Sequence, residues 1–245
     1  MIKHLRIYVL FLIAGCTAPA EEITSSTQPH WELSAEYVAN TMLQSNASIA
    51  EALRYKQFVQ LRGRDLPQVY LSYQRMARRM GLYPLPALYL DKDDRQALPQ
   101  AAARFTREGK SYIIINPRAQ EVWSSRELIA VLGHELVHLK ERHVTAQSLA
   151  EAFNHPEISV THELEADRLG SGPLGSCDPQ ALEDALQIVA DIDMKDYRNK
   201  NPFKASDDYN TLIGADHPHM EQRKAALDEM AANPSQNCIR ASSIR

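Results

Sequence analysis

The sequence carries little excess charge of either sign. Its 27 lysines and arginines are nearly matched by 31 aspartates and glutamates, so the formal net charge at pH 7 is −4 for 245 residues. Domains that bind nucleic acids usually carry a basic patch and have a high pI. The charge balance therefore argues against a nucleic acid as a partner.

Glycine is also sparse, with 9 copies, whereas the 13 prolines are an ordinary number, and we find no low-complexity tract. No repeat occurs at the periods typical of solenoid proteins. The hydrophobic fraction of 44% and the charged fraction of 24% are ordinary for a globular protein. The length suits one sizeable domain, which we place at residues 31–245.

Long hydrophobic runs are missing as well. The apolar run Ile7–Ala14 is too short to span a bilayer. It follows Lys3 and Arg6, a pattern typical of a secretory signal peptide, which we place at residues 1–15. The run ends in the letters "IAGC", which resemble a bacterial lipobox, in which the chain is cut before the cysteine and the cysteine is lipidated. The alternative is a plain signal peptide followed by an incidental Cys16.

A lipidated Cys16 would anchor the protein in the bacterial cell envelope. Several acyl chains hold firmly, whereas one chain alone gives only marginal binding. Residues 16–30 are polar and rich in Pro, Ser and Thr, which predicts a flexible tether between the lipid and the domain. By analogy with bacterial lipoprotein sorting, Thr17 in place of an aspartate favours the outer membrane, facing the periplasm.

Cysteine is rare, with three copies, and only Cys177 and Cys238 remain after Cys16 is assigned to the lipid. An exported chain meets an oxidising compartment, where two remaining thiols commonly pair. We therefore expect a disulfide between Cys177 and Cys238. The alternative is two buried free thiols.

Local signals predict a mainly helical α+β domain with one small sheet. Capping residues and helix-stopping glycines mark the helix ends. Runs of β-prone residues around a Gly-containing turn mark a hairpin. Helices are expected to begin at Ser34 and Ser48 and to cover 67–81, 124 onward, 159–170 (stopped by Gly170), 178–194 and 221–231, with a strand at 87–90 and a hairpin at 103–116.

The stretch "GHELVHLKERH" places His134 and His138 four positions apart, on one face of the helix that starts at the Ser124–Glu127 capping box. Glu135 lies beside the first histidine. Two histidines at this spacing with an adjacent glutamate are typical of a zinc site with a general base. The alternative is a chance match on a charged helix, but the many apolar flanking residues indicate a buried helix, where unpaired His and Glu would be costly.

A catalytic zinc ion needs a third protein ligand, and "HELEADRLG" offers one. Glu163 and Asp167 share a helix face; we assign Glu163 as the ligand and Asp167 as the acceptor for the distal N–H of a ligand imidazole. Asp167 could instead form a surface salt bridge with Arg168 or a neighbour. His162 could bind the metal in place of Glu163, although its helical phase differs. Glu165 is expected to be solvated.

The chain resembles the zinc metallopeptidase (gluzincin) family that includes HtpX and the CAAX prenyl protease. Three stretches carry the resemblance: "SSRELIAVLGHELVHLKERH", "HELEADRLG" and "DHPHMEQRKAAL". The likeness covers about residues 82–230 and is nearest to the soluble, exported branch of BepA and LoiP. It implies a zincin-like fold with a small β-sheet beside the active-site helix. It also implies one Zn²⁺ per chain, bound by His134, His138 and Glu163, with Glu135 as the catalytic base. The stretch "ALPQAAARFTREGK" departs from the family pattern, which puts substrate preference in doubt.

His217 lies in "GADHPHM", before the last expected helix. Local chemistry alone predicts helix entry, with Asp216 as the cap and Pro218 in the first turn. The resemblance implies a role near the zinc. His217 would either fill the open metal position and keep the enzyme latent, or stabilise the oxyanion. His219, two residues on, is expected to face solvent.

The predicted function is a zinc-dependent endopeptidase of the cell envelope that degrades misfolded or misassembled envelope proteins. Its substrates would be unfolded or extended segments, added as a strand to the free edge expected at Tyr112–Asn116. One alternative is a zinc-binding, chaperone-like envelope lipoprotein with little or no proteolytic activity. Another is a non-peptidase hydrolase with the same metal ligands, which no further motif supports.

Overall fold

The computed structural model describes residues 58–92, 98–106, 109–143, 156–200 and 218–233, and Cys238. The signal peptide, the tether with Cys16, the two helices expected at Ser34 and Ser48, and His217 with its predicted roles lie outside the described residues.

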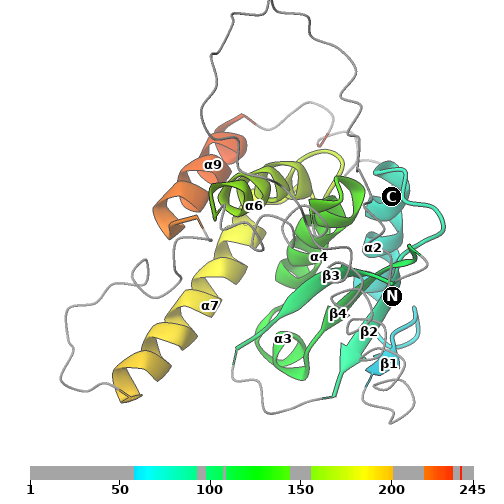
Figure 1. Cartoon of the computed structure of the whole chain (residues 1–245), viewed down its shortest axis with the longest axis horizontal. Helices are drawn as coiled ribbons and strands as arrows, with labels where there is room; N and C mark the ends of the chain where they lie inside the picture. The colour runs from blue at the N-terminus through cyan, green and yellow to red at the C-terminus, as the bar shows by residue number, and fades with distance from the viewer. Residues whose placement is uncertain are drawn as a thin grey trace, which may run out of the picture.

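The domain is mainly helical, with a small sheet along one side (Figure 1). The sequence predicted this α+β class correctly. The strands are β1 (Phe58–Gln60), β2 (Ala87–Asp91), β3 (Ala101–Phe105) and β4 (Ser111–Ile115). The helices are α2 (Pro67–Arg79), α3 (Pro117–Val122), α4 (Ser125–Lys140), α6 (Pro156–Ser171), α7 (Pro179–Lys200) and α9 (Met220–Ala232).

The sheet has the strand order β1-β2-β4-β3, with β2 and β4 parallel and the other pairs antiparallel. The expected hairpin is therefore confirmed as β3 and β4. The prediction of a free edge at Tyr112–Asn116 is wrong, because β4 pairs with β2 on its other side, where Leu88 faces Ile113. A nearly continuous apolar run such as "SYIII" is typical of an interior strand rather than an edge. The edge beside the helices is β3.

Helix α4 is the centre of the domain and packs against α2, α6, α7 and β3. It begins as predicted: the Ser124 side chain accepts from the Glu127 backbone N–H, and the Glu127 carboxylate accepts from the Ser124 N–H. Most of its residues are buried, on more than one face. Because α4 is enclosed in this way, its polar side chains are held by neighbours on several sides.

Helix α6 crosses α4 at a backbone contact between two glycines. A Cβ atom on Gly170 would lie 2.6 Å from the backbone N and Cα of His134, and one on Gly133 would lie 2.6 Å from the Gly170 carbonyl oxygen. The predicted role of Gly170 as the helix stop is wrong, because α6 continues to Ser171. Glycine is needed here for close approach between helices and not for a left-handed turn.

The ends of the last two helices differ from the prediction. Helix α7 starts as expected, with the Asp178 carboxylate accepting from the Ala181 N–H at 3.1 Å, but continues to Lys200 instead of ending near residue 194. Helix α9 has His219 at its N-cap, with Gln222 Oε1 accepting from the His219 N–H at 2.9 Å. The expectation that Pro218 lies in the first turn is therefore wrong, and the expected cap Asp216 lies outside the described residues. His219 is exposed, as predicted.

The expected disulfide is present between Cys177 and Cys238, whose Cα atoms lie 5.5 Å apart. The two cysteines are separated by 61 positions. In the chain-entropy account, closing a loop of this length stabilises the fold by about 4 kcal/mol. The bond joins the turn after α6 to the chain that follows α9.

Replacing Gly170 by alanine tests the helix crossing. An alanine in a helix interior normally stabilises by about 1 kcal/mol relative to glycine, but here the added Cβ meets backbone that cannot move aside. We expect Gly170→Ala to lower the free energy of unfolding by about 1–3 kcal/mol, measured by urea denaturation. Gly63→Ala is the control, because its Cβ would lie 3.5 Å from a Tyr70 ring carbon. Equal stability of the two variants would contradict the tight crossing.

Candidate metal centre

Three side chains from two helices converge on one point. His134 and His138 lie one turn apart on α4, and Glu163 comes from α6. One ligand atom from each lies within 4.8 Å of the other two. The two histidine Nε2 atoms are 2.9 Å apart, and each is 3.4 Å from one oxygen of the Glu163 carboxylate. Two imidazole nitrogens and a carboxylate in this arrangement could hold a metal ion.

The outer nitrogen of His134 is held by a buried carboxylate. His134 Nδ1 lies 2.9 Å from Asp167 Oδ1, and the Asp167 side chain has no exposed surface. The alternative of a surface salt bridge with Arg168 is wrong, since Arg168 is exposed and the partner of Asp167 is Arg223 from α9. Arg223 Nε donates to Asp167 Oδ2 at 2.7 Å and Nη2 donates to Oδ1 at 2.5 Å.

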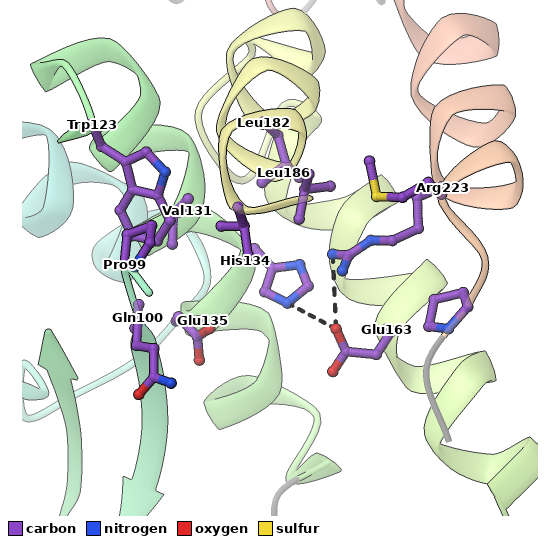
Figure 2. Close-up of a pocket in the computed structure, with 14 residues that line it drawn as sticks. Pro99, Gln100, Trp123, Val131, His134, Glu135, Glu163, Leu182, Leu186 and Arg223 are labelled. Atoms are coloured by element: carbon purple, nitrogen blue, oxygen red, sulfur yellow. Dashed lines mark ion pairs between the residues drawn. The ribbon is translucent and has the colours of Figure 1, made fainter. Parts of the chain in front are cut away.

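Arg223 was not identified from the sequence. Figure 2 shows its guanidinium beside Glu163 and His134, and its Nη2 lies 3.7 Å from Glu163 Oε2. It therefore contacts the acceptor of one histidine and a metal-ligand candidate at once. The only signal available was its position within "HPHMEQR", one helical turn after His219, and nothing in that spacing specifies a partner on α6.

The electrostatics of the group favour a bound cation. Burial opposes the charged form of His134, but the hydrogen bonds that it donates to Asp167 and Glu163 raise its pKa to about 10. Burial, followed by the nearby charge of His134, lowers the pKa of His138 to about 3. Despite their burial, Glu163 and Asp167 have lowered pKa values, chiefly because of His134 and Arg223 respectively. Without metal the cluster retains a proton on His134, and a metal ion would displace that proton.

The donor atoms fit a metal ion for a further reason. Asp167 orients His134 so that Nδ1 carries a proton, and the Nε2 atoms of both histidines then face each other and the Glu163 carboxylate. Lone pairs at this separation repel unless a cation lies between them, and either the proton of His134 or a metal ion can be that cation. The arrangement therefore suits a metal ion bound in place of that proton.

Glu135 lies beside this group but is not part of it. Its Oε2 accepts a hydrogen bond of 2.7 Å from the backbone N–H of Ala103 on β3. Burial raises the pKa of Glu135, and the charge of His134 opposes this rise. The carboxylate is therefore held between the metal ligands and the edge of the sheet (Figure 2).

The other acidic and histidine side chains of α6 face a different neighbour. Glu165, expected to be solvated, is only 37% exposed and its Oε2 lies 3.2 Å from His143 Nε2. His162 is not part of the converging group; its ring stacks on His143 with the centroids 4.1 Å apart. His143 is 3% exposed and was not identified from the sequence, although it closes the "HLKERH" stretch.

A cleft of about 430 Å³ opens onto the site. Its polar lining residues are Gln100, His134, Glu135, Glu163 and Arg223 (Figure 2). Its other lining residues are apolar: Pro99, Ala101, Trp123, Val131, Leu182, Leu186, Val189, Pro218 and Met220. The cleft can therefore hold an apolar group next to the candidate metal ligands.

Comparisons with known proteins show similarity to one family of peptidases. The pattern of peptidase family M48 matches residues 67–161, which include α2, the sheet after β1, and α4. A "Protease HtpX homolog" of Arthrobacter sp. (strain FB24) is 25% identical over 277 aligned positions, covering 91% of this chain and 93% of the relative. One of Polynucleobacter necessarius subsp. necessarius (strain STIR1) is 25% identical over 228 positions, covering 69% and 75%.

The fold is similar to the crystal structure of S. mikatae Ste24p, with a TM-score of 0.55 and 18% sequence identity. The match covers 79% of this chain and 57% of that one. At this identity the likeness concerns the fold alone. Among the residues described, no helix is both long and apolar enough to cross a membrane.

Removing Arg223 tests whether it supports the site. Arg223→Gln would leave the Asp167 carboxylate buried without its guanidinium, so we expect the metal-free protein to lose about 3–5 kcal/mol of unfolding free energy. Chemical denaturation measures this loss. Lys224→Gln is the matched control: the neighbouring side chain pairs with Glu183 and Asp228 at the surface, and its removal should leave stability unchanged. A stable Arg223→Gln variant would show that Asp167 does not depend on this pair.

Proposed function

This chain carries a domain of peptidase family M48 and is a metallopeptidase, and from that premise we propose that it is a zinc-dependent endopeptidase with Glu135 as its general base. The observation that carries the proposal is the convergence of His134, His138 and Glu163, with Glu135 between this group and the edge of the sheet. The position of Glu135 outside the ligand group leaves its carboxylate available for proton transfer.

We assign zinc as the metal because two imidazoles and one carboxylate are a common ligand set of catalytic zinc sites, which keep a fourth position open. When bound, the ion would lower the pKa of a water molecule toward neutrality and polarise the scissile carbonyl. Asp167 would hold His134 in the tautomer that presents Nε2 to the ion, and Arg223 would hold Asp167.

Glu135 is suited to the role of base by its surroundings. Burial raises the pKa of its carboxyl group, which makes the carboxylate a stronger proton acceptor than an exposed glutamate. The Ala103 N–H fixes one oxygen. The other oxygen would take the proton of the attacking water and pass it to the leaving amine.

The substrate we propose is an extended polypeptide segment that pairs with β3. In the β3–β4 ladder, Gln100 and Thr106 bond toward β4, so the alternation of an antiparallel pair turns the backbone groups of Ala101, Ala103 and Phe105 away from β4. Those of Ala103 are engaged by Glu135 and Arg104, so the substrate would pair with Ala101 and Phe105. Main-chain pairing demands little of the substrate sequence. The apolar lining residues of the cleft would favour a hydrophobic side chain near the scissile bond.

Misfolded proteins expose extended, apolar segments of this kind. We therefore propose that the enzyme degrades misfolded or misassembled proteins of the cell envelope. Support for the location comes from the signal-peptide pattern and the lipobox-like residues before Cys16, and from the disulfide between Cys177 and Cys238, which suits an oxidising compartment.

Glu135→Gln tests the catalytic assignment. The variant keeps the three ligands, so it should bind about one zinc ion per chain, like the wild type, yet cleave an unfolded protein such as casein about 10²–10⁴-fold more slowly, the range that general-base catalysis contributes. Elemental analysis and gel-based cleavage assays measure the two properties. Glu163→Ala should lose both.

The results separate the alternatives. Activity retained in Glu135→Gln would exclude Glu135 as the base. A wild-type protein that binds zinc without cleaving any unfolded substrate would instead favour the chaperone-like function.

The membrane anchor has its own test. In cells grown with labelled palmitate, the wild-type protein should carry the label and fractionate with membranes, because acyl chains on Cys16 would hold it there. Cys16→Ser should lose the label. A wild-type protein without label in the soluble fraction would contradict the lipoprotein assignment, and the outer-membrane location with it.

A further inference from the structure

The second metal-ligand candidate, His138, has a partner that the helix alone cannot provide. His143 follows it by five positions, and on a continuous helix two such residues point about 140° apart. Helix α4 ends at Lys140, and Arg142 adopts a left-handed conformation with φ of 59°. This turn brings His143 back against His138, with the two ring centroids 5.2 Å apart.

The left-handed conformation is unfavourable for a side chain that is not glycine, and such residues cluster at functional sites. Here the strained Arg142 has an identifiable result. His143, although it follows the end of the helix, is almost completely buried. Its Nδ1 lies 3.3 Å from His138 Nδ1.

The hydrogen-bond partners fix where the protons must lie. His138 Nε2 faces His134 Nε2 and Glu163, so this is the nitrogen that would bind a metal and it must be unprotonated. The proton of a neutral His138 then lies on Nδ1, which can only donate. His143 Nδ1 must be the acceptor, which leaves the proton of His143 on Nε2.

Glu165 completes this assignment. Its Oε2 lies 3.2 Å from His143 Nε2, the atom that carries the proton. His162 stacks on the other side, almost parallel to His143 with an interplanar angle of 6°, and so fixes the ring plane. His162 Nδ1 is buried without a hydrogen-bond partner among the described residues, so His162 adds packing and no acceptor to the chain of bonds.

We propose that His143 is a positioning residue of the metal centre: it accepts the His138 Nδ1–H, is anchored through its own Nε2–H by Glu165, and thereby holds His138 with Nε2 toward the metal. The inference rests on the proposed metal site. It makes the two histidine ligands unequal, because a charged carboxylate supports His134 and a neutral imidazole supports His138.

The test compares variants that keep and remove the acceptor. In His143→Asn, the amide oxygen takes the place of Nδ1 and can still accept from His138; in His143→Leu, no acceptor remains. Zinc dissociation constants are measured by competition with a chromophoric chelator. We expect His143→Leu to bind zinc about 10–100-fold more weakly, the usual effect of losing an outer partner of a ligand. His143→Asn keeps the acceptor but loses the Nε2–H that Glu165 anchors, so it should recover part of the affinity.

A second readout reports ligand geometry without activity. The visible absorption bands of the cobalt(II)-substituted protein should shift in His143→Leu and resemble the wild type in His143→Asn. His162→Phe is the matched control, since it keeps a ring stacked on His143 and removes only the ring nitrogens, and its zinc affinity and cobalt spectrum should equal those of the wild type. Glu165→Leu, at a partly exposed position, should weaken zinc binding in the same direction as His143→Leu, even if the latter does not fold.

Wild-type affinity in His143→Leu or in Glu165→Leu would overturn the proposal. An Asn variant as weak as the Leu variant would also overturn it, because the ring volume would then matter and the acceptor would not. If the wild-type chain binds no zinc, the metal site itself is overturned. If the wild type binds zinc and the variants bind it equally well, only the role of His143 is overturned.

Discussion

The close approach of α6 to α4 is the constraint on which the rest of the site depends. Helices that meet through side chains usually lie 8–10 Å apart, whereas Gly133 and Gly170 bring backbone against backbone. Glu163, Asp167 and Gly170 are spaced by four and three positions and therefore share one face of α6. The glycine contact at His134 places this whole face onto α4, so one packing contact sets the position of a metal-ligand candidate and of the carboxylate that supports its neighbour.

Burial of so much charge in one place needs partners from several elements. Asp167 is shared between His134 on α4 and Arg223 on α9, and both partners favour its ionised form. A buried carboxylate with one partner removed is costly. Helix α9 is thus part of the metal centre although it supplies no ligand candidate, and the match to family M48 ends at residue 161, before Glu163, Asp167 and α9.

The sequence predicted those features that are determined by residues close together in the chain. The Ser124–Glu127 cap, the strand pair β3–β4, and the residues that meet at the metal centre follow from spacing and capping over a few positions. The predictions that proved wrong, and the residues that were missed, depend on contacts between distant segments of the chain. Nothing in "SYIII" says that β2 lies on its far side, and nothing near Asp167 specifies Arg223. The sequence around Gly170 is typical of a helix end, yet glycine is required there because the backbone of α4 lies against it. His143 was overlooked because helical phase separates it from His138, and only the left-handed Arg142 overrides that phase.

The disulfide between Cys177 and Cys238 also gives the chain a closed covalent topology. The ring that it closes contains α7 and α9, and with them Arg223, whereas Glu163 and Asp167 lie on the chain just outside it. A peptidase is exposed to cleavage by its own copies. A single cut anywhere between the two cysteines, including the stretch from residue 201 to residue 217, opens the ring but releases no fragment. The guanidinium that supports Asp167 would stay covalently linked to the site after such a cut, for as long as the bond remains oxidised.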